Sequence, residues 1–405
     1  MTKAHYPGRQ SGAPIRRISR REMLRRMGVG AGGLSLAALL AACGIEGQSQ
    51  DTESDENAGL TTAEITGTLN FANWPLYIDR AKGENPTLND FTEATDIAVN
   101  YDEVIQDNAS FFGTIREPLA NGEPIDYDLI VVTDWLIDKM ARLGYLEEID
   151  HERLTNFEAN AAEIYKDPPF DPGNTYSIPW QSGITGIAYN RALTGRDLTS
   201  VGDLFDTEFA GKIGMFKEMR DTMNLMLLLN GVEPKEATIE DVEAVQQQLL
   251  KQVDDGIVRQ YYGNEYADAL ARKDIVASIA WSGDVIQLTL DDPDLRFVVP
   301  DEGGILWVDN MAIPQNAANP IDAHEFMNFV YQPEIAAQIV GWVNYICPVP
   351  AAKEILAETK GYESVADSPL VFPTPEMEAN LHSYKILSEE EEQEWNDLFQ
   401  QVLQG

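Results

Sequence analysis

Short apolar segments that favour β-structure alternate with longer amphipathic segments along most of this chain. Residues 86–104 and 111–134 each predict a helix and a strand, and residues 135–149 add another helix with a stop at Gly144. A second stretch, residues 212–299, contains further helices and strands. This alternation favours an α/β fold around largely parallel sheets.

The chain has 405 residues, of which 44% are hydrophobic and 9% aromatic. This length predicts two domains or one large two-lobed unit. The composition is sufficient for a full hydrophobic core, so we do not expect global disorder.

The formal net charge of -38 argues against nucleic acid as a partner, because the phosphates would be repelled. Such acidity suits cationic ligands. It is equally compatible with a solvated surface that keeps the protein soluble.

The N-terminal region carries a targeting pattern rather than a folded element. SRREMLRRM contains the pair Arg20 and Arg21, and a weakly apolar run follows from Gly28 to Ala42 and ends in LAAC at Cys43. This resembles a twin-arginine signal peptide (residues 1–42) with a lipobox; the alternative is a basic arm followed by a chance cysteine. We therefore expect export, lipidation of Cys43, a polar tether over residues 43–64, and a membrane-anchored protein in the periplasm or on the cell surface.

The sequence predicts neither a metal site nor a disulfide bond. Cys347 is the second of two cysteines, so lipidation of Cys43 excludes an internal disulfide. The four histidines are widely spaced and form no metal-ligand pattern. We expect no cofactor and no metal.

Acidic residues lie close to tryptophans, or to one another, at three places. In GGILWVDNMAI, Trp307 and Asp309 are two residues apart on an apolar segment that predicts a buried strand, so they share one face. WSGD places Trp281 near Asp284 at a predicted strand end. KEMRDTM spaces Glu218 and Asp221 by three, which puts both on one face of a first helical turn.

Several motifs, in their order, resemble one family: the polyamine-binding (spermidine and putrescine) solute receptors of ABC transporters. The motifs are NFANWPLYID, YDLIVVTDWLIDKM, YSIPWQSGITGIAYN, IAWSGDV, EGGILWVDNMAIP and VNYICPVPAAKEIL, within about residues 66–360. The resemblance implies a two-lobed, periplasmic-binding-protein-like fold of type II, with discontinuous lobes, a hinge and the ligand in the cleft. We expect residues 65–185 and 309–355 in lobe 1, and residues 186–308 and 356–405 in lobe 2.

The resemblance also implies a set of ligand contacts with a clear chemical logic. Each ammonium group of a polyamine needs carboxylates, because an unpaired buried charge is costly. The methylenes need apolar walls, and aromatic faces both pack on methylenes and attract cations. The implied residues are Trp74, Tyr77, Thr133, Asp134, Trp135, Glu218, Asp221, Trp281, Asp284, Trp307, Asp309 and Tyr345.

Several of these assignments have a structural alternative. Trp307 and Asp309 could be a packed core residue and a turn residue, Asp284 could cap a helix, and Glu218 could pair with a neighbouring basic residue. Tyr345 could be a core or hinge residue. Three tyrosines lie near a contact loop of the family, and the sequence does not choose among them: Tyr261, Tyr262 and Tyr266.

The clearest departure from the family pattern is Leu76, which stands where the family usually has an acid just before the tyrosine. This removes one expected ammonium partner. We hypothesise that Asp134 replaces it.

The sequence therefore predicts a non-catalytic, monomeric receptor that delivers putrescine or spermidine to an ABC permease. Alternatives are a receptor for another small organic cation, a sensor that signals ligand closure to a partner, and, less favoured, a carboxylate-dependent hydrolase of glycosides.

Overall fold

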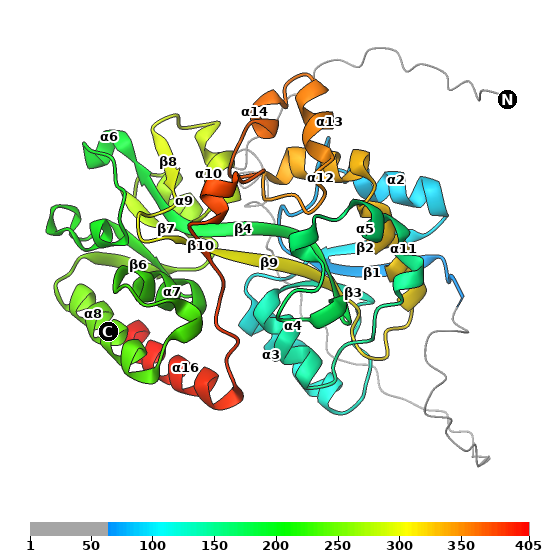
Figure 1. Ribbon diagram of the computed structural model, residues 1–405, viewed down its shortest axis with the longest axis horizontal. Coiled ribbons are helices and arrows are strands. Elements are labelled where there is room, and N and C mark those ends of the chain that lie inside the picture. The colour runs from blue at the N-terminus through cyan, green and yellow to red at the C-terminus, as the bar shows by residue number, and fades with distance from the viewer. Residues whose placement is uncertain (1–63, 405) are drawn as a thin grey trace, which may run out of the picture. The chain divides into compact units, whose positions relative to one another are not determined.

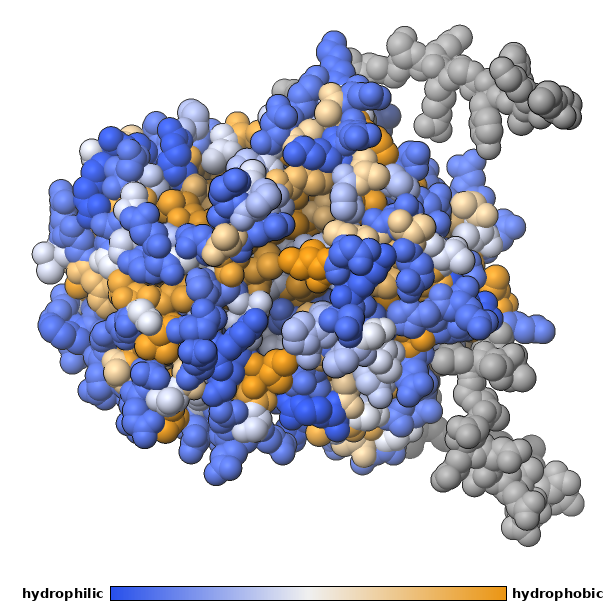
Figure 2. Space-filling model, viewed as in Figure 1, coloured by the Kyte–Doolittle hydropathy of each residue, from blue (hydrophilic) through white to orange (hydrophobic). Residues whose placement is uncertain are grey.

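The computed structural model describes residues 64–404. The predicted signal peptide, the lipidation site Cys43 and most of the predicted tether lie outside this range. Within it, no helix is long and apolar enough to cross a membrane. Hydrophilic side chains cover much of the face drawn in Figure 2, and apolar residues appear there in small groups.

The strands are β1 (Thr68–Asn73), β2 (Ala98–Glu103), β3 (Leu129–Thr133), β4 (Ser177–Asn190), β5 (Ile213–Phe216), β6 (Val258–Tyr262), β7 (Ala277–Trp281), β8 (Leu295–Val298), β9 (Gly304–Ala312) and β10 (Leu381–His382). The helices are α2 (Pro86–Thr95), α3 (Asn108–Ala120), α4 (Asp134–Arg142), α5 (Thr155–Asn160), α6 (Arg191–Thr194), α7 (Met219–Leu229), α8 (Ile239–Asp254), α9 (Tyr266–Ala271), α10 (Ser282–Thr289), α11 (Pro320–Val330), α12 (Pro333–Val343), α13 (Ala352–Glu358), α14 (Glu363–Ala366), α15 (Pro375–Glu378) and α16 (Glu389–Gln404).

The strands form a mixed sheet in the order β2-β1-β3-β9-β4-β7-β5-β6, with β10 beside β9 and β8 beside β4. The outer groups β2-β1-β3 and β7-β5-β6 are parallel, as predicted. The central strands β9 and β4 pair antiparallel with each other and with both groups, so the prediction of largely parallel sheets is wrong there. These two strands lie between the parallel groups, outside the strand–helix–strand crossovers that make each group parallel, so their pairing is free to be antiparallel.

The fold has two lobes. The first lobe holds β1, β2 and β3, and the second lobe holds β5, β6 and β7; Figure 1 shows β4 and β9 passing from one to the other. The predicted crossings after residues 185 and 308 fall inside β4 and β9, and the predicted crossing after residue 355 falls inside α13. The exact lobe boundaries stay a prediction.

Strand β3 explains how the first lobe is covered on both faces. All five of its residues are buried. Leu129 and Val131 belong to one hydrophobic cluster, whereas Ile130 and Val132 belong to another that includes Phe112 of α3. Because side chains alternate along a strand, the two clusters lie on opposite faces of the sheet, as in an α/β fold with helices on both sides.

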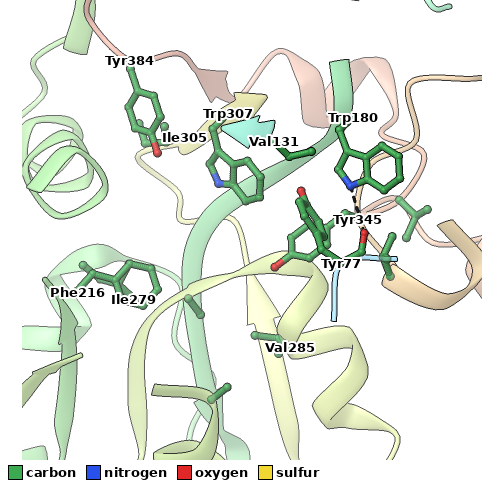
Figure 3. Packing of buried hydrophobic residues seen from close by; sticks show 14 of the residues in the cluster. Tyr77, Val131, Trp180, Phe216, Ile279, Val285, Ile305, Trp307, Tyr345 and Tyr384 are labelled. Carbon is green, nitrogen blue, oxygen red and sulfur yellow. Dashed lines mark hydrogen bonds between the residues drawn. The ribbon is translucent and has the colours of Figure 1, made fainter. Parts of the chain in front are cut away.

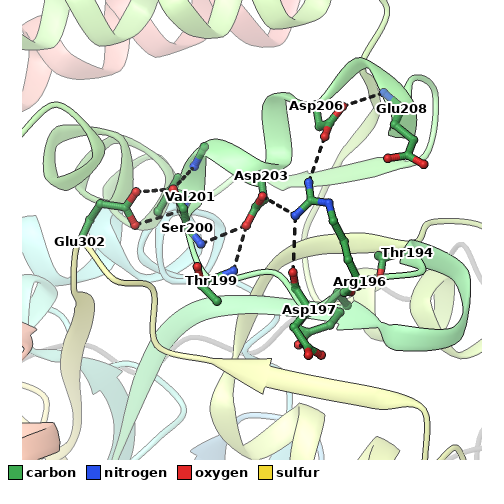
Figure 4. Close-up of polar contacts among 12 residues, drawn as sticks. Thr194, Arg196, Asp197, Thr199, Ser200, Val201, Asp203, Asp206, Glu208 and Glu302 are labelled. Carbon is green, nitrogen blue, oxygen red and sulfur yellow. Dashed lines mark hydrogen bonds and ion pairs between the residues drawn. The ribbon is translucent and has the colours of Figure 1, made fainter.

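Polar contacts fix the start of β9. The Ser200 hydroxyl donates to Glu302, and the Val201 backbone N–H donates to the other oxygen of Glu302 at 3.2 Å (Figure 4). Nearby, the Arg196 guanidinium binds Asp203 at 2.7 Å and Asp206 at 2.9 Å. Glu302 lies directly before Gly303 and Gly304, and β9 begins at Gly304. The contacts of Glu302 with Ser200 and Val201 therefore anchor the chain at the start of this strand.

Candidate functional site

Trp307 and Asp309 lie at the middle of β9, where the strand passes between the lobes. Both side chains are buried, whereas Leu306 and Val308 are half-buried. The predicted strand and the shared buried face are therefore confirmed. Asp309 lies opposite Thr133 in β3 and opposite Gln181 in β4.

The Thr133 hydroxyl donates a hydrogen bond of 2.7 Å to Oδ1 of Asp309. The side chain of Asn108 fixes Thr133, because its Nδ2 donates to the hydroxyl at 2.8 Å and its Oδ1 accepts from the Thr133 backbone N–H at 3.2 Å. Two predicted site residues far apart in sequence are thus brought into direct contact.

Aromatic rings form a row that runs from Trp307 through Tyr345 and Tyr77 to Trp180 (Figure 3). The ring centroids of Trp307 and Tyr345 are 5.6 Å apart, and those of Tyr345 and Tyr77 are 5.4 Å apart. Trp180, which was not predicted, follows Tyr77 at 6.5 Å and donates from its indole N–H to the Tyr77 carbonyl oxygen at 3.2 Å. Such a wall suits a chain of methylenes or a cation.

Two glycines make room for these rings. A Cβ at Gly183 would come within 2.3 Å of the Trp307 ring, and a Cβ at Gly283 within 2.5 Å of the Tyr345 ring. Any larger side chain would displace the aromatic wall.

The hydroxyl of Tyr77 is buried and makes no hydrogen bond of regular geometry with any residue in 64–404. It nevertheless lies near Asp309: burial raises the pKa of Tyr77 well above its usual value, and the charge of Asp309 raises it further.

Asp221 in α7 is the most completely bonded acid of the site. Oδ1 accepts hydrogen bonds from the hydroxyls of Thr185 at 2.7 Å and Tyr384 at 2.5 Å, and Oδ2 accepts from the Trp281 indole N–H at 3.0 Å. Burial raises the pKa of Asp221, although these three donors oppose the shift. The predicted residues Asp221 and Trp281 are therefore in contact.

Asp284 lies in the first turn of α10, and Trp281 holds the N-cap position, so Asp284 is not the helix cap. It accepts hydrogen bonds from the Tyr266 hydroxyl at 3.1 Å and the Tyr345 hydroxyl at 3.3 Å. Among the three undecided tyrosines, Tyr266 is the one that reaches a predicted site acid.

Glu218 caps α7, and its carboxylate accepts from the Arg220 backbone N–H at 3.3 Å. The helix begins at Met219, so the prediction that Glu218 lies within the first turn is wrong by one residue. Such a cap satisfies a backbone donor that the helix leaves open. Lys217 pairs with Glu265 instead of Glu218.

Asp134 is the first residue of α4 and reaches across to β9. Its Oδ1 accepts from the Trp135 backbone N–H at 2.6 Å, and its Oδ2 accepts from the Val308 backbone N–H at 3.2 Å. The face of Trp135 is covered by the Arg220 guanidinium, 4.3 Å from the ring centroid.

The far end of the site lies around Trp74 and Leu76. The indole N–H of Trp74 donates to the Val131 carbonyl oxygen at 3.0 Å. Leu76 has a φ of 58°, an uncommon conformation for a residue with a side chain, and its N–H donates to Glu103 at 3.2 Å. A positive φ in a residue with a side chain costs energy and persists only where neighbouring contacts hold it, and here the hydrogen bond to Glu103 helps to hold the turn.

The buried acids of the site favour a bound positive charge. Burial raises the pKa of Asp134 to about 7, of Glu218 to about 7 and of Asp309 to about 6. Crowded acids in a low-dielectric region are held ionised by a cation that neutralises them. Within residues 64–404 no group of three or more His, Cys, Asp or Glu side chains is arranged to hold a metal ion.

Sequence reasoning missed several members of the site: Asn108, Thr185, Arg220 as a ring contact, Tyr384 and Glu392. Thr185 lies in β4, which the sequence marks only as apolar and turn-rich. Tyr384 lies outside the matched motifs, in an irregular segment just after β10. No local pattern could have found it.

Comparison with known proteins gives a consistent result. Residues 87–372 match the family described as "Bacterial extracellular solute-binding protein". The spermidine/putrescine-binding periplasmic protein 1 of Haemophilus influenzae is 27% identical over 86% of this chain and 90% of its own length. The spermidine/putrescine-binding periplasmic protein of Escherichia coli is 29% identical over 78% of this chain and 85% of its own length.

A solved structure supports the same assignment. The spermidine/putrescine ABC transporter substrate-binding protein of Streptococcus pneumoniae superposes with a TM-score of 0.70 at 28% identity, covering 83% of this chain and 98% of that one. With the family match spanning most of the chain, and with the two-lobed sheet that places these acids and rings together, the protein belongs to the bacterial extracellular solute-binding protein family.

Proposed function

We propose that this protein is the substrate-binding receptor of an ABC importer and that it captures a polyamine, putrescine or spermidine, between its lobes. The observation that carries the proposal is the combination around Asp309: buried carboxylates with raised pKa values beside a wall of aromatic rings. The ammonium groups of the ligand would pair with the acids and keep them ionised, and its methylenes would pack on the rings. The names of the relatives agree with this ligand class.

In this proposal the twelve predicted side chains contact the ligand or position the side chains that do. Because eight of the twelve are buried and the other four are half-buried, the ligand enters when the lobes separate and is enclosed when they close. Lobe 1 would comprise residues 65–185 and 309–355, and lobe 2 residues 186–308 and 356–405.

Cellular placement is part of the same proposal. Twin-arginine export, lipidation of Cys43 and a flexible tether would hold a monomeric receptor at the outer face of the membrane, next to its permease. The protein would bind without chemical conversion. The acids support this, because their neighbours are hydroxyls, indoles and Arg220, an arrangement suited to binding a cation.

A second candidate is a receptor for another small organic cation, such as agmatine. Leu76 favours it, since an apolar side chain stands where the polyamine receptors usually have an acid. For a polyamine, by contrast, Asp134 would take the place of that acid, and its hydrogen bond from the Val308 backbone N–H of β9 supports this role.

A thermal-unfolding panel on the chain from Cys43 onward tests the proposal, with putrescine, spermidine, spermine, cadaverine and agmatine as ligands and with amino acids and sugars as controls. A ligand at about 100 times its Kd stabilises the folded state by about 2.7 kcal/mol, which is a shift of several degrees. We expect at least one amine to give this shift. A shift with a sugar or an amino acid, and none with any amine, would overturn the proposal.

Variants make the test specific to the site. Asp309→Asn should lower amine affinity at least about tenfold, because it removes a buried counter-charge. The matched control is Asp254→Asn at the exposed end of α8, which should leave affinity unchanged.

A further inference from the structure

Gln181 is a buried polar residue of the central strand β4 to which neither the sequence resemblance nor the contacts of the site assign a role. Its side chain is 3% exposed, and its amide oxygen Oε1 is buried without a hydrogen-bond partner in residues 64–404. A carbonyl oxygen placed in this way has lost its hydrogen bonds to water and gained none from the protein, which is unfavourable. Its position in the sheet therefore needs an explanation.

The register of the sheet shows toward which face the Gln181 side chain points. Gly183 lies opposite Trp307 and Gln181 lies opposite Asp309, with regular pairing between these two positions. A Cβ at Gly183 would meet the Trp307 ring, so this face of β4 is the one that carries the ring. Side chains two residues apart on a strand share a face, so Gln181 lies on the same face as Trp307 and Asp309.

Asp309 thus has a polar residue opposite it on each neighbouring strand, Thr133 in β3 and Gln181 in β4. Directly opposite side chains in an antiparallel pair have Cβ atoms about 4.5–5.5 Å apart. Thr133 donates its hydroxyl hydrogen to Asp309 at 2.7 Å. The Gln181 Oε1 cannot bond an ionised carboxylate, because both groups are acceptors. The two groups can share a donor that lies between them.

Other buried amides of residues 64–404 with an unbonded oxygen are held by their nitrogen. This nitrogen donates to a backbone carbonyl oxygen in each case: Asn224 to Arg220 at 2.6 Å, Gln252 to Leu204 at 2.8 Å and Asn310 to Val308 at 2.9 Å. Within the same residues, no hydrogen bond holds the Gln181 amide at either end. A structural hydrogen bond therefore does not account for this glutamine.

We propose that Gln181 is a further ligand-binding residue, whose amide oxygen accepts a hydrogen bond from the ligand nitrogen that pairs with Asp309. This inference rests on the proposed function as an amine receptor and adds a neutral acceptor to its acids. A primary ammonium group carries three N–H donors, and Asp309 already accepts from Thr133 at one oxygen. The amide oxygen takes one of the remaining donors, so ligand binding also satisfies the buried Oε1.

This role predicts opposite effects on stability and on binding. Methionine at position 181 would keep nearly the same shape and remove the unsatisfied oxygen, so the ligand-free protein should be equally stable or more stable. In the complex the same substitution leaves one ligand N–H buried without an acceptor, so affinity should fall. A glutamine with a structural role would lower the stability of the ligand-free protein when it is replaced.

The test combines titration calorimetry, with putrescine and spermidine, and urea unfolding of the ligand-free protein, both on the chain from Cys43 onward. Gln181→Met should lower the affinity for the tighter-binding amine at least about fivefold, with the urea midpoint unchanged or raised. Gln181→Glu keeps an acceptor oxygen at the same reach, so it should restore affinity to within about threefold of the wild type.

The matched control is Gln252→Met in α8. Gln252 is also a buried glutamine with an unbonded Oε1, but its Nε2 donates to the Leu204 carbonyl oxygen. This substitution should lower the urea midpoint and leave amine affinity unchanged, the reverse of the pattern expected for Gln181→Met.

Two results would overturn the inference. Unchanged affinity of Gln181→Met would show that Oε1 meets only water in the complex. A Gln181→Met protein that is destabilised, or that does not fold, would show that the amide has a structural role. If the wild type binds neither amine, the proposed function itself is overturned, and the inference with it.

Discussion

The hydroxyl of Thr133 donates to the buried carboxylate of Asp309 at 2.7 Å, which links the end of β3 to the middle of β9. The two residues are 176 positions apart in the chain. Their contact lies at the junction of the two lobes, so the hydrogen bond both stabilises the negative charge of Asp309 and ties the central strand to the first lobe.

Removing this donor should weaken amine binding. The Thr133 hydrogen bond lowers the pKa of Asp309 against the effect of burial, so Thr133→Val should raise that pKa and reduce the ionised fraction at neutral pH. We expect a loss of affinity of about fivefold to tenfold at pH 7, measured by calorimetry, and a smaller loss at pH 8.5. An equal loss at both pH values would show that packing, rather than charge, causes the effect.

The pH dependence of stability and of binding should have opposite signs. Asp309, Asp134 and Glu218 have folded-state pKa values of about 6, 7 and 7, whereas unfolded carboxyl groups titrate near pH 4. Between about pH 4 and pH 7 the folded protein therefore binds more protons at these groups than the unfolded chain. Their contribution to stability falls as the pH rises through this window.

The measurement compares urea unfolding of the ligand-free wild type with that of Asp309→Asn from pH 5 to pH 8. The wild type should lose free energy of unfolding relative to the variant as the pH rises. Over the same range its affinity for a diamine should increase, because the cation needs ionised acids. A wild-type affinity that falls with increasing pH would contradict the charge assignment.

Gly183 should tolerate no larger residue. A Cβ at this position would lie 2.3 Å from the Trp307 ring, so Gly183→Ala should displace the ring and cost about 1–3 kcal/mol in the free energy of unfolding. The control is Gly113→Ala in α3, where no atom lies within 4 Å of the new Cβ and the helix gains propensity. Equal changes in the free energy of unfolding for the two substitutions would show that Gly183 is not closely packed against Trp307.

Tyr384 should contribute to binding although it lies outside the motifs. Its hydroxyl donates to Asp221 at 2.5 Å, and Tyr384→Phe removes this donor and keeps the ring. We expect amine affinity to fall about threefold to tenfold, with the melting temperature lowered by only a few degrees. Unchanged affinity would place Tyr384 outside the functional site.

Cys43 should determine where the protein resides in the cell. Cys43→Ser removes the acceptor thiol for the lipid, so the exported protein should move from the membrane fraction to the soluble extracytoplasmic fraction. Fractionation followed by immunoblotting measures the change, and Cys347→Ser is the matched control at the buried second cysteine. Retention of Cys43→Ser in the membrane would argue against lipid anchoring.

Some features follow from local sequence. Proline begins α12, where its fixed φ suits the first helical position, and the backbone N–H of Glu391 donates to the Ser388 hydroxyl before α16. Trp307 and Asp309 share a buried face because alternation along a strand is a property of the backbone itself.

Other features could not be predicted from local sequence. The antiparallel pairing of β9 and β4 depends on which strands lie next to each other in the folded sheet. The start of α7, one residue after Glu218, depends on the capping of its first turn by the Glu218 side chain. Arg220 on Trp135 and Tyr384 on Asp221 join residues from different elements, and no spacing in the chain encodes those contacts.

The α/β class, the pairing of acids with aromatic residues and the chemical class of ligand that such pairs favour all follow from the sequence alone. These are properties of residue type and local periodicity. The partners of each acid, by contrast, are set by the tertiary structure. Hydrogen-bond partners and burial depend on the fold: Asp309 meets Thr133, and Asp221 meets Tyr384, only because the chain brings β3 beside β9 and the segment after β10 against α7.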